Sequence, residues 1–161
     1  MKRKPLGYRR LINHCKQNYK FCILPTLEAD DAIGIDATRF ADPENIVVSP
    51  DKDMKQIPSN LWNLSDDVVE ITVEDGDRWH LIQTLSGDPT DGYSGCPGIG
   101  VKRATELLDK NENKWEAVCK AFRDRGLSDD DALLNARLAK ILRQEDYDLT
   151  NSQPILWNPK L

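Results

Sequence analysis

Three short acidic clusters constrain this chain more than any other feature of its sequence. Each follows an apolar or β-prone run, and together they hold seven carboxylates: Glu28, Asp30, Asp31, Asp51, Asp53, Asp88 and Asp91. Like charges repel when a fold gathers them, so such clusters are costly without metal ions or protons. Mg²⁺ prefers carboxylate oxygen and water as ligands, and two such ions ~4 Å apart can promote phosphodiester cleavage. The clusters therefore indicate a two-metal site in which these seven residues are both ligands and catalytic groups.

The position of the clusters along the chain supports this interpretation. The apolar run Phe21–Leu24, closed by Pro25, predicts a buried strand directly before the first cluster. The β-branched run Asn45–Ser49 predicts a strand of a parallel sheet directly before the second. In open α/β sheets, sites collect at the carboxyl ends of strands. Taken singly, each cluster is better explained as helix N-terminal charge or as a turn; the three together favour a site.

The spacing of apolar residues along the rest of the chain predicts an α/β first half and a helical second half in one compact unit. Two short strands, 61–64 and 68–73, are expected to form a hairpin, and residues 50–56 a short turn or helix. A turn is expected at Asp42-Pro43 and an irregular tail after residue 142. The expected helices cover residues 7–20, 27–40 with Thr26 as N-cap, 76–85, 101–108, 115–122 and 129–142.

A glycine turn follows the third cluster, at Pro97-Gly98-Ile99-Gly100-Val101-Lys102. Glycines permit positive φ and a close approach of backbone to ligand, and amides at a helix N-terminus suit a phosphate oxygen. Ile99 is expected to pack inward while Lys102 adds positive charge. A structural turn between helices is the alternative, but the apolar second helix favours a helix-hairpin-helix element that grips DNA through its backbone.

Charge is distributed unevenly, although the net charge is −5. Residues 1–20 carry seven Lys or Arg and no acid, whereas residues 28–91 carry sixteen acids and four basic residues. Bound metal would offset the acidic middle. The four cysteines have neither CxxC spacing nor a dense framework, which predicts reduced thiols. No apolar run approaches the ~20 residues of a membrane helix, and the basic N-terminus lacks a signal-peptide core.

These motifs, in this order, resemble the 5′–3′ exonucleases of phages, in the flap-endonuclease superfamily of PIN-like nucleases, and most of all the exonuclease of T-odd podoviruses. The resemblance covers nearly the whole chain. The segments that carry it are Lys4–Tyr8, Leu27–Asp31, Ser49–Lys55, Trp79–Gln83, Gly87–Gly95 and Ala136–Arg143, with Tyr147 and Trp157 further on.

The resemblance implies a partial PIN-like (Rossmann-like) sheet over residues 1–86, followed over 87–161 by a helix-hairpin-helix (H3TH) element and C-terminal helices packed as one unit. It implies Mg²⁺, two ions for which Mn²⁺ can substitute, and a K⁺ ion at the hairpin. Glu28, Asp30, Asp31 and Asp51 resemble the ligands of the more catalytic ion, and the other three acids those of the second. The implied substrates are duplex or flap DNA and RNA–DNA hybrid primers, cleaved during phage replication in the host cytoplasm. The implied DNA-binding residues are Gly98, Ile99, Gly100, Lys102, Arg103 and Lys4.

The sequence departs from the family pattern at its start. Family members begin with a strand carrying Asp-Gly-Asp, a second strand and basic arch helices, and this chain shows none of these motifs. Three alternatives stay open: a self-sufficient metal-dependent nuclease, the C-terminal piece of a split nuclease that needs an N-terminal fragment, and a DNA-binding module without catalysis.

Overall fold

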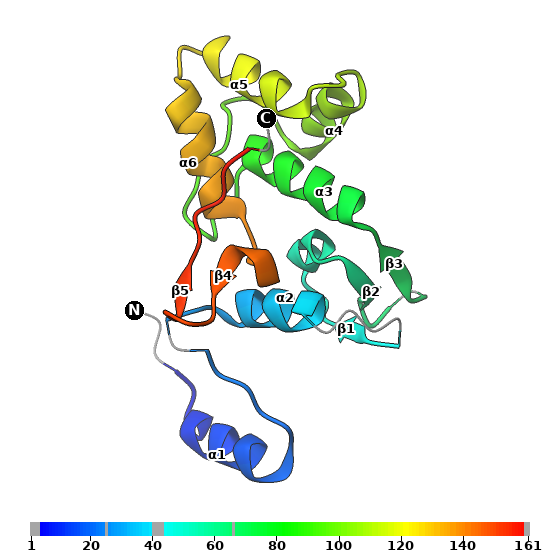
Figure 1. Ribbon diagram of the computed structural model, residues 1–161, viewed down its shortest axis with the longest axis vertical. Helices are drawn as coiled ribbons and strands as arrows, with labels where there is room; N and C mark the ends of the chain where they lie inside the picture. The colour runs from blue at the N-terminus through cyan, green and yellow to red at the C-terminus, as the bar shows by residue number, and fades with distance from the viewer. Residues whose placement is uncertain (1–3, 25, 40–43, 66, 160–161) are drawn as a thin grey trace.

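The computed structural model describes residues 4–24, 26–39, 44–65 and 67–159. The predicted Asp42-Pro43 turn lies outside them. Figure 1 shows three regions: the N-terminal helix at one end, a small sheet with α2 (Ala29–Arg39) in the middle, and a helical bundle at the other end. None of the helices in the described parts of the chain is both long and apolar enough to cross a membrane.

The sheet has three strands, β1 (Ile46–Val48), β2 (Ser59–Trp62) and β3 (Val69–Ile71). β1 pairs parallel to β2, with Val47 opposite Leu61, and β2 pairs antiparallel to β3. The predicted parallel pairing and the predicted hairpin are both confirmed. β1 and β2 are joined through a short 3-10 helix, η1 (Lys52–Gln56), which brings the second acidic cluster to the carboxyl end of β1.

Among the residues that the structure describes, only one face of this sheet is covered. Val47 and Leu61 are buried in a small core with Met54, Ile57 and Ile141. On the opposite face Ile46 and Val48 are 49% and 54% exposed. The unalternating β-branched run predicted β1 as a strand of a parallel sheet, which is normally covered on both sides; among the described residues it is covered on one.

The prediction of a buried strand at Phe21–Leu24 is wrong. These residues form no regular structure, and Phe21 and Ile23 are 37% and 59% exposed. An apolar run becomes a strand only when its backbone groups find a neighbouring strand to pair with. Within the described part of the chain, no strand pairs with this run.

The predicted N-terminal helix is confirmed as α1 (Tyr8–Asn18). Its apolar residues lie on one face, but none of its residues is buried. Figure 1 shows α1 standing apart from the rest of the molecule, at the opposite end from α4 (Val101–Asp109).

The helical half packs around α3 (Val73–Ser86), which contacts α4, α5 (Lys114–Arg123) and α6 (Asp129–Ala139). Thr72 and Ser128 form capping boxes at the starts of α3 and α6, satisfying backbone amides that would otherwise lack partners. The core includes Ile82, Leu85 and Phe122, all 1% exposed or less. α3, which lies before the predicted boundary at residues 86 and 87, thus shares its core with the helices that follow the boundary.

The tail is more ordered than predicted. After α6 the chain forms η2 (Gln144–Asp146) and a two-stranded hairpin of β4 (Tyr147–Asp148) and β5 (Gln153–Pro154). It then runs back along α6 (Figure 1), where Arg137 Nε donates to the Trp157 carbonyl at 3.0 Å. The Trp157 ring meets His80 and Trp115 edge-on, at centroid distances of 5.0 and 5.2 Å.

Candidate metal centre

Three of the predicted carboxylates converge on one point. Asp53, Asp88 and Asp91 each offer an oxygen, and these atoms all lie within 4.8 Å of one another. Asp53 stands in the first turn of η1, whereas Asp88 and Asp91 belong to the loop that follows α3. Residues some 35 positions apart thus form one acidic site of the size that a hard divalent cation occupies.

The loop that carries Asp88 and Asp91 is flanked by two glycines whose backbones lie against each other. Gly87 and Gly95 have φ of 68° and 64°, which favours glycine. A Cβ on Gly95 would lie 2.3 Å from the Gly87 nitrogen. Asp88 N–H donates to the Tyr93 carbonyl at 3.0 Å, and Gly95 N–H donates to Asn135 Oδ1 of α6 at 2.9 Å. The loop is therefore shaped by backbone contacts that only glycine permits.

Asp88 is ion-paired in this structure. Lys52 Nζ donates to Asp88 Oδ2 at 3.0 Å, and Thr90 N–H donates to Asp88 Oδ1 at 2.9 Å. The Lys52 hydrogen bond, followed by that of Thr90, holds the pKa of Asp88 below its usual value. Because the Lys52 side chain is 63% exposed, it can withdraw from Asp88 at little cost when a cation arrives.

The other two carboxylates of the trio are pushed toward protonation. Burial, and then the charge of Asp51, raises the pKa of Asp53. Burial, and then the charges of Asp88, Asp30 and Asp51, raises the pKa of Asp91. Burial and like-charge repulsion are both relieved by a bound cation, so this arrangement favours metal binding.

The remaining four predicted ligands lie around this centre. Glu28, Asp30 and Asp31 share with Asp53 and Asp91 the lining of one cavity of 570 Å³. Asp30 and Asp31 stand in the first turn of α2, where the helix dipole favours them. Asp31 Oδ1 accepts from the Leu142 backbone N–H at 3.0 Å, and burial raises the pKa of Asp31.

Asp51 lies at the edge of the site. It is exposed, caps η1 by accepting from Asp53 N–H at 3.0 Å, and does not line the cavity. Its charge nevertheless raises the pKa values of both Asp53 and Asp91. The structure thus brings the three sequence clusters together, and oxygens of Asp53, Asp88 and Asp91 lie within 4.8 Å of one another.

The glycine turn connects this loop to α4. Ile99 is buried in the main core, as predicted, whereas Gly98, Gly100 and Lys102 are exposed. Gly100 is the N-cap residue of α4, and no side chain in the described part of the chain caps this helix start. Amides at such a start are available to an anion. The Gly98 carbonyl accepts from Arg103 Nη1 at 2.9 Å, so a cation at that carbonyl would have to displace the guanidinium.

Lys4 lies far along the chain from these elements, in the segment before α1. It is exposed, and its Nζ stands 4.3 Å from the centroid of the Tyr8 ring. This cation–π contact leaves the charge at the surface.

Sequence reasoning missed several residues at the site. Lys52 sits between two predicted ligands, which was a usable signal for an ion pair. Gln83 donates to Asp53 Oδ1 at 2.6 Å. Its sequence position gave no signal of this role, because a glutamine in a helical segment is ordinarily a surface residue. Arg137 and Lys140 line the cavity through the fold of α6 and the segment after it.

Curated proteins similar to this chain are nucleases. The exodeoxyribonuclease of Enterobacteria phage T3 is 30% identical over 195 residues, covering 98% of this chain and 65% of that protein. The exonuclease of Escherichia phage T7 is 29% identical over 194 residues, with the same coverage of 98% and 65%. A 5′–3′ exonuclease of Mycobacterium tuberculosis is 33% identical over 108 residues, 54% of this chain and 34% of that protein. No protein-family model matches the chain, and no solved structure matches it significantly.

An acidic trio on a mixed α/β scaffold thus lies in a chain whose similar proteins, along almost its whole length, are named as exonucleases. The chain is similar along 98% of its length to these two phage exonucleases, and along 54% of its length to the bacterial 5′–3′ exonuclease. It spans 65% of the length of the two phage relatives. Since the aligned stretches exceed the 161 residues of this chain, the relatives carry insertions that it lacks.

Proposed function

We propose that this protein is a metal-dependent 5′–3′ exonuclease that hydrolyses phosphodiester bonds in DNA. The observation that carries the proposal is the convergence of Asp53, Asp88 and Asp91 within 4.8 Å, in a chain whose relatives are named as exonucleases. The donor set is all carboxylate, which suits Mg²⁺, with Mn²⁺ as a substitute. By analogy with the phage relatives, the reaction would take place in the cytoplasm of an infected cell, in phage replication.

We assign two metal positions to the seven carboxylates. Asp53, Asp88 and Asp91 would hold one ion, and Glu28, Asp30, Asp31 and Asp51 would hold the other, in part through water. When bound, the ions would supply an activated water and offset the charge that develops on the phosphate. The protein's own contribution is to keep five of these carboxylates, Glu28, Asp30, Asp31, Asp53 and Asp91, at the lining of one cavity and to present Lys52, Arg137 and Lys140 nearby.

We propose that the substrate is gripped as a duplex through its phosphate backbone. The uncapped start of α4 at Gly100, with exposed Gly98, Lys102 and Arg103 and the buried anchor Ile99, supports an H3TH-type contact. Flap DNA and RNA–DNA hybrids fit the same contact, because it reads no base. A K⁺ ion here requires Arg103 to release the Gly98 carbonyl. Lys4 would add a phosphate contact from the N-terminal segment.

The second candidate is a nuclease that completes its site with an N-terminal fragment, and binds DNA without cleaving it when alone. The uncovered face of the sheet, with exposed Ile46 and Val48 on the edge strand β1, supports this candidate. It differs from the first in one respect that can be measured, which is cleavage by this chain alone.

The test is incubation of the purified chain with labelled 5′-flap and nicked duplex DNA in Mg²⁺, with EDTA as the blank. The proposal expects Mg²⁺-dependent 5′-phosphorylated products, lost in Asp53→Asn and kept in Asp36→Asn. The control residue is also an acid, exposed on α2. Binding that survives EDTA without cleavage would refute self-sufficient activity. Cleavage that then appears on adding an N-terminal fragment would establish the second candidate.

A further inference from the structure

A chain of buried amides connects the candidate metal centre to the end of α6 and the segment that follows it. We infer that Gln83 is a positioning residue that fixes the orientation of the Asp53 carboxylate, and that Gln56 fixes Gln83 in turn; the inference rests on the proposed metal-dependent function. Gln83 Nε2 donates to Asp53 Oδ1 at 2.6 Å, and Gln56 Nε2 donates to Gln83 Oε1 at 2.7 Å. The two glutamines are only 4% and 1% exposed, so solvent has little access to their amide groups.

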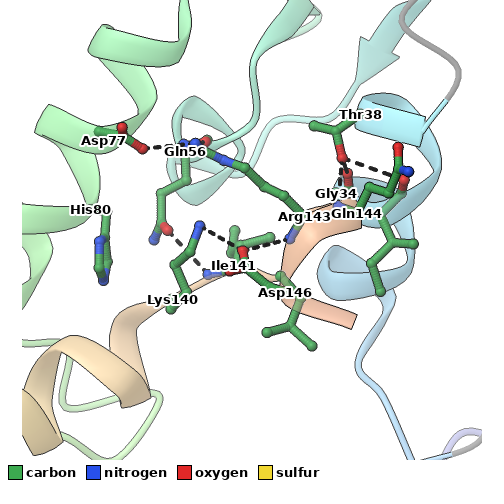
Figure 2. A network of polar contacts seen from close by, with 12 residues as sticks. Gly34, Thr38, Gln56, Asp77, His80, Lys140, Ile141, Arg143, Gln144 and Asp146 are labelled. Atoms are coloured by element: carbon green, nitrogen blue, oxygen red, sulfur yellow. Dashed lines mark hydrogen bonds and ion pairs between the residues drawn. The ribbon is translucent and has the colours of Figure 1, made fainter. Parts of the chain in front are cut away.

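Backbone groups determine which way the side-chain amide of Gln56 points in this chain of hydrogen bonds. Gln56 Oε1 accepts from Ile141 N–H at 3.1 Å, and Gln56 Nε2 also donates to the Ala139 carbonyl at 2.6 Å. Figure 2 shows Gln56 contacting Ile141 in this way. A backbone amide can only donate and a carbonyl can only accept, so the Gln56 amide cannot flip without losing both partners. Its NH₂ group must then face Gln83 Oε1.

The orientation of the Gln83 amide in turn fixes the orientation of the Asp53 carboxylate. With Oε1 of Gln83 engaged by Gln56, the NH₂ group of Gln83 is the group presented to Asp53. A donor at 2.6 Å requires an acceptor oxygen, so Gln83 selects one carboxylate rotamer and engages one of its two oxygens. The other lone pairs of Asp53 remain for a cation. Partners of this kind around a metal centre orient the ligands, and their loss typically costs about 10–100-fold in metal affinity.

The segment that anchors Gln56 also holds the first acidic cluster. Its Leu142 N–H donates to Asp31 Oδ1 at 3.0 Å, and its Gln144 N–H donates to Thr38 Oγ1 of α2 at 2.8 Å (Figure 2). A Cβ on Gly34 of α2 would lie 2.3 Å from the Leu142 carbonyl oxygen, so helix and segment are in direct contact. Residues 139–144 therefore position Asp31 directly and Asp53 through two glutamines, which links the two groups of proposed ligands.

A purely structural role for Gln83 predicts a different effect of substitution than a positioning role does. If the amide merely satisfied its neighbours in the core, its removal would lower the stability of the fold and leave cation binding by the folded protein unchanged. The variant Gln83→Met keeps the volume and length of the side chain and removes both hydrogen bonds. The matched control is Thr84→Val. Thr84, the next residue of α3, is 0% exposed and its hydroxyl donates to the His80 carbonyl at 2.9 Å, away from the acids.

The experiment is calorimetric titration of Mn²⁺, without DNA, into the folded wild-type, Gln83→Met and Thr84→Val proteins. We expect Gln83→Met to bind Mn²⁺ about tenfold or more weakly and Thr84→Val to bind as the wild type does. Equal affinity in wild type and Gln83→Met would overturn the positioning role and leave the proposed function intact. An equal loss in both variants would also overturn it, since the effect would then come from general destabilisation.

A second measurement needs no variant. In the wild-type protein, the side-chain NH₂ resonances of Gln83 and Gln56 should shift together during a Mg²⁺ titration, because the bound ion polarises the carboxylate to which they are linked. Resonances that stay fixed while Mg²⁺ binds would overturn the positioning role. A wild type that binds neither ion would overturn the proposed function itself, and the inference with it.

Discussion

His80 should make this fold sensitive to mild acid. It lies in the middle of α3, is 2% exposed, and its Nε2 is 2.7 Å from the Ala136 carbonyl of α6. Burial lowers the pKa of His80 from 6.5 to about 4. The ring is therefore neutral in the folded protein at pH 7, and its Nε2 is the N–H donor to Ala136. In the unfolded chain the same ring is in water and takes up a proton below its ordinary pKa.

The sign and size of the effect follow from proton linkage. Between pH 6.5 and about 4 the unfolded state binds a proton that the folded state does not, so acid stabilises the unfolded state in that window. Above pH 6.5 His80 costs the folded state nothing, because the ring is neutral in both states. As the pH falls below 6.5, the free energy of unfolding decreases. At about 1.4 kcal/mol per pKa unit, the full loss is about 3.5 kcal/mol, and roughly 2.5 kcal/mol of it is lost by pH 4.5.

The assay is urea unfolding at pH 7 and at pH 4.5 of the wild type and His80→Gln, whose amide can still donate to Ala136 but does not titrate. The wild type should lose about 2.5 kcal/mol more than the variant between the two pH values. His14→Gln, at an exposed site on α1, is the matched control and should behave as the wild type. Equal losses in wild type and His80→Gln would refute the argument that burial keeps this ring neutral.

Three further predictions concern the site and its surroundings. Lys52→Met should tighten Mn²⁺ binding by roughly 1.5- to 5-fold, as expected for release of an exposed ion pair to Asp88, and calorimetry that finds weaker binding would contradict it. Gly95→Ala should cost at least about 2 kcal/mol of unfolding free energy, because it combines a positive φ with a backbone clash, and it should also abolish Mn²⁺ binding. Unchanged urea midpoints and affinity would contradict this prediction. A thiol reagent should modify exposed Cys22 in the native protein and spare Cys119, whose pKa burial raises to about 11; mass mapping that finds both modified alike would disprove it.

Much of the candidate site could be read from local sequence. The runs before Asp51 and around the Ser59–Ile71 hairpin carry β-branched residues and turn signals, and they fold as those signals predict. Asp30 and Asp31 open a helix whose start the acids themselves favour. Ile99 between two glycines is buried as expected. These features depend on neighbours within a few residues, so a single sequence contains the information.

The run Phe21–Leu24 shows where local reasoning fails. Its composition fits a strand, but a strand also needs a partner, and none of the described residues supplies one. Gln56 and Gln83 show that local reasoning also fails to identify polar residues that the fold buries. Polar residues at ordinary helical positions became buried, 1% and 4% exposed, because segments 27 and more than 80 residues apart in sequence meet around them.

The sequence by itself determined the chemical character of the site, since only clustered carboxylates beside a glycine turn provide hard oxygen ligands next to phosphate-binding amides. Only the tertiary structure decided which acids meet. It joined Asp53 to Asp88 and Asp91 through the contact of η1 with α3, and it kept Asp51 at the edge. The physical reason is that ligand geometry depends on the packing of distant segments, such as residues 139–144 against α2 and Gln56, and those contacts have no local signature in the chain.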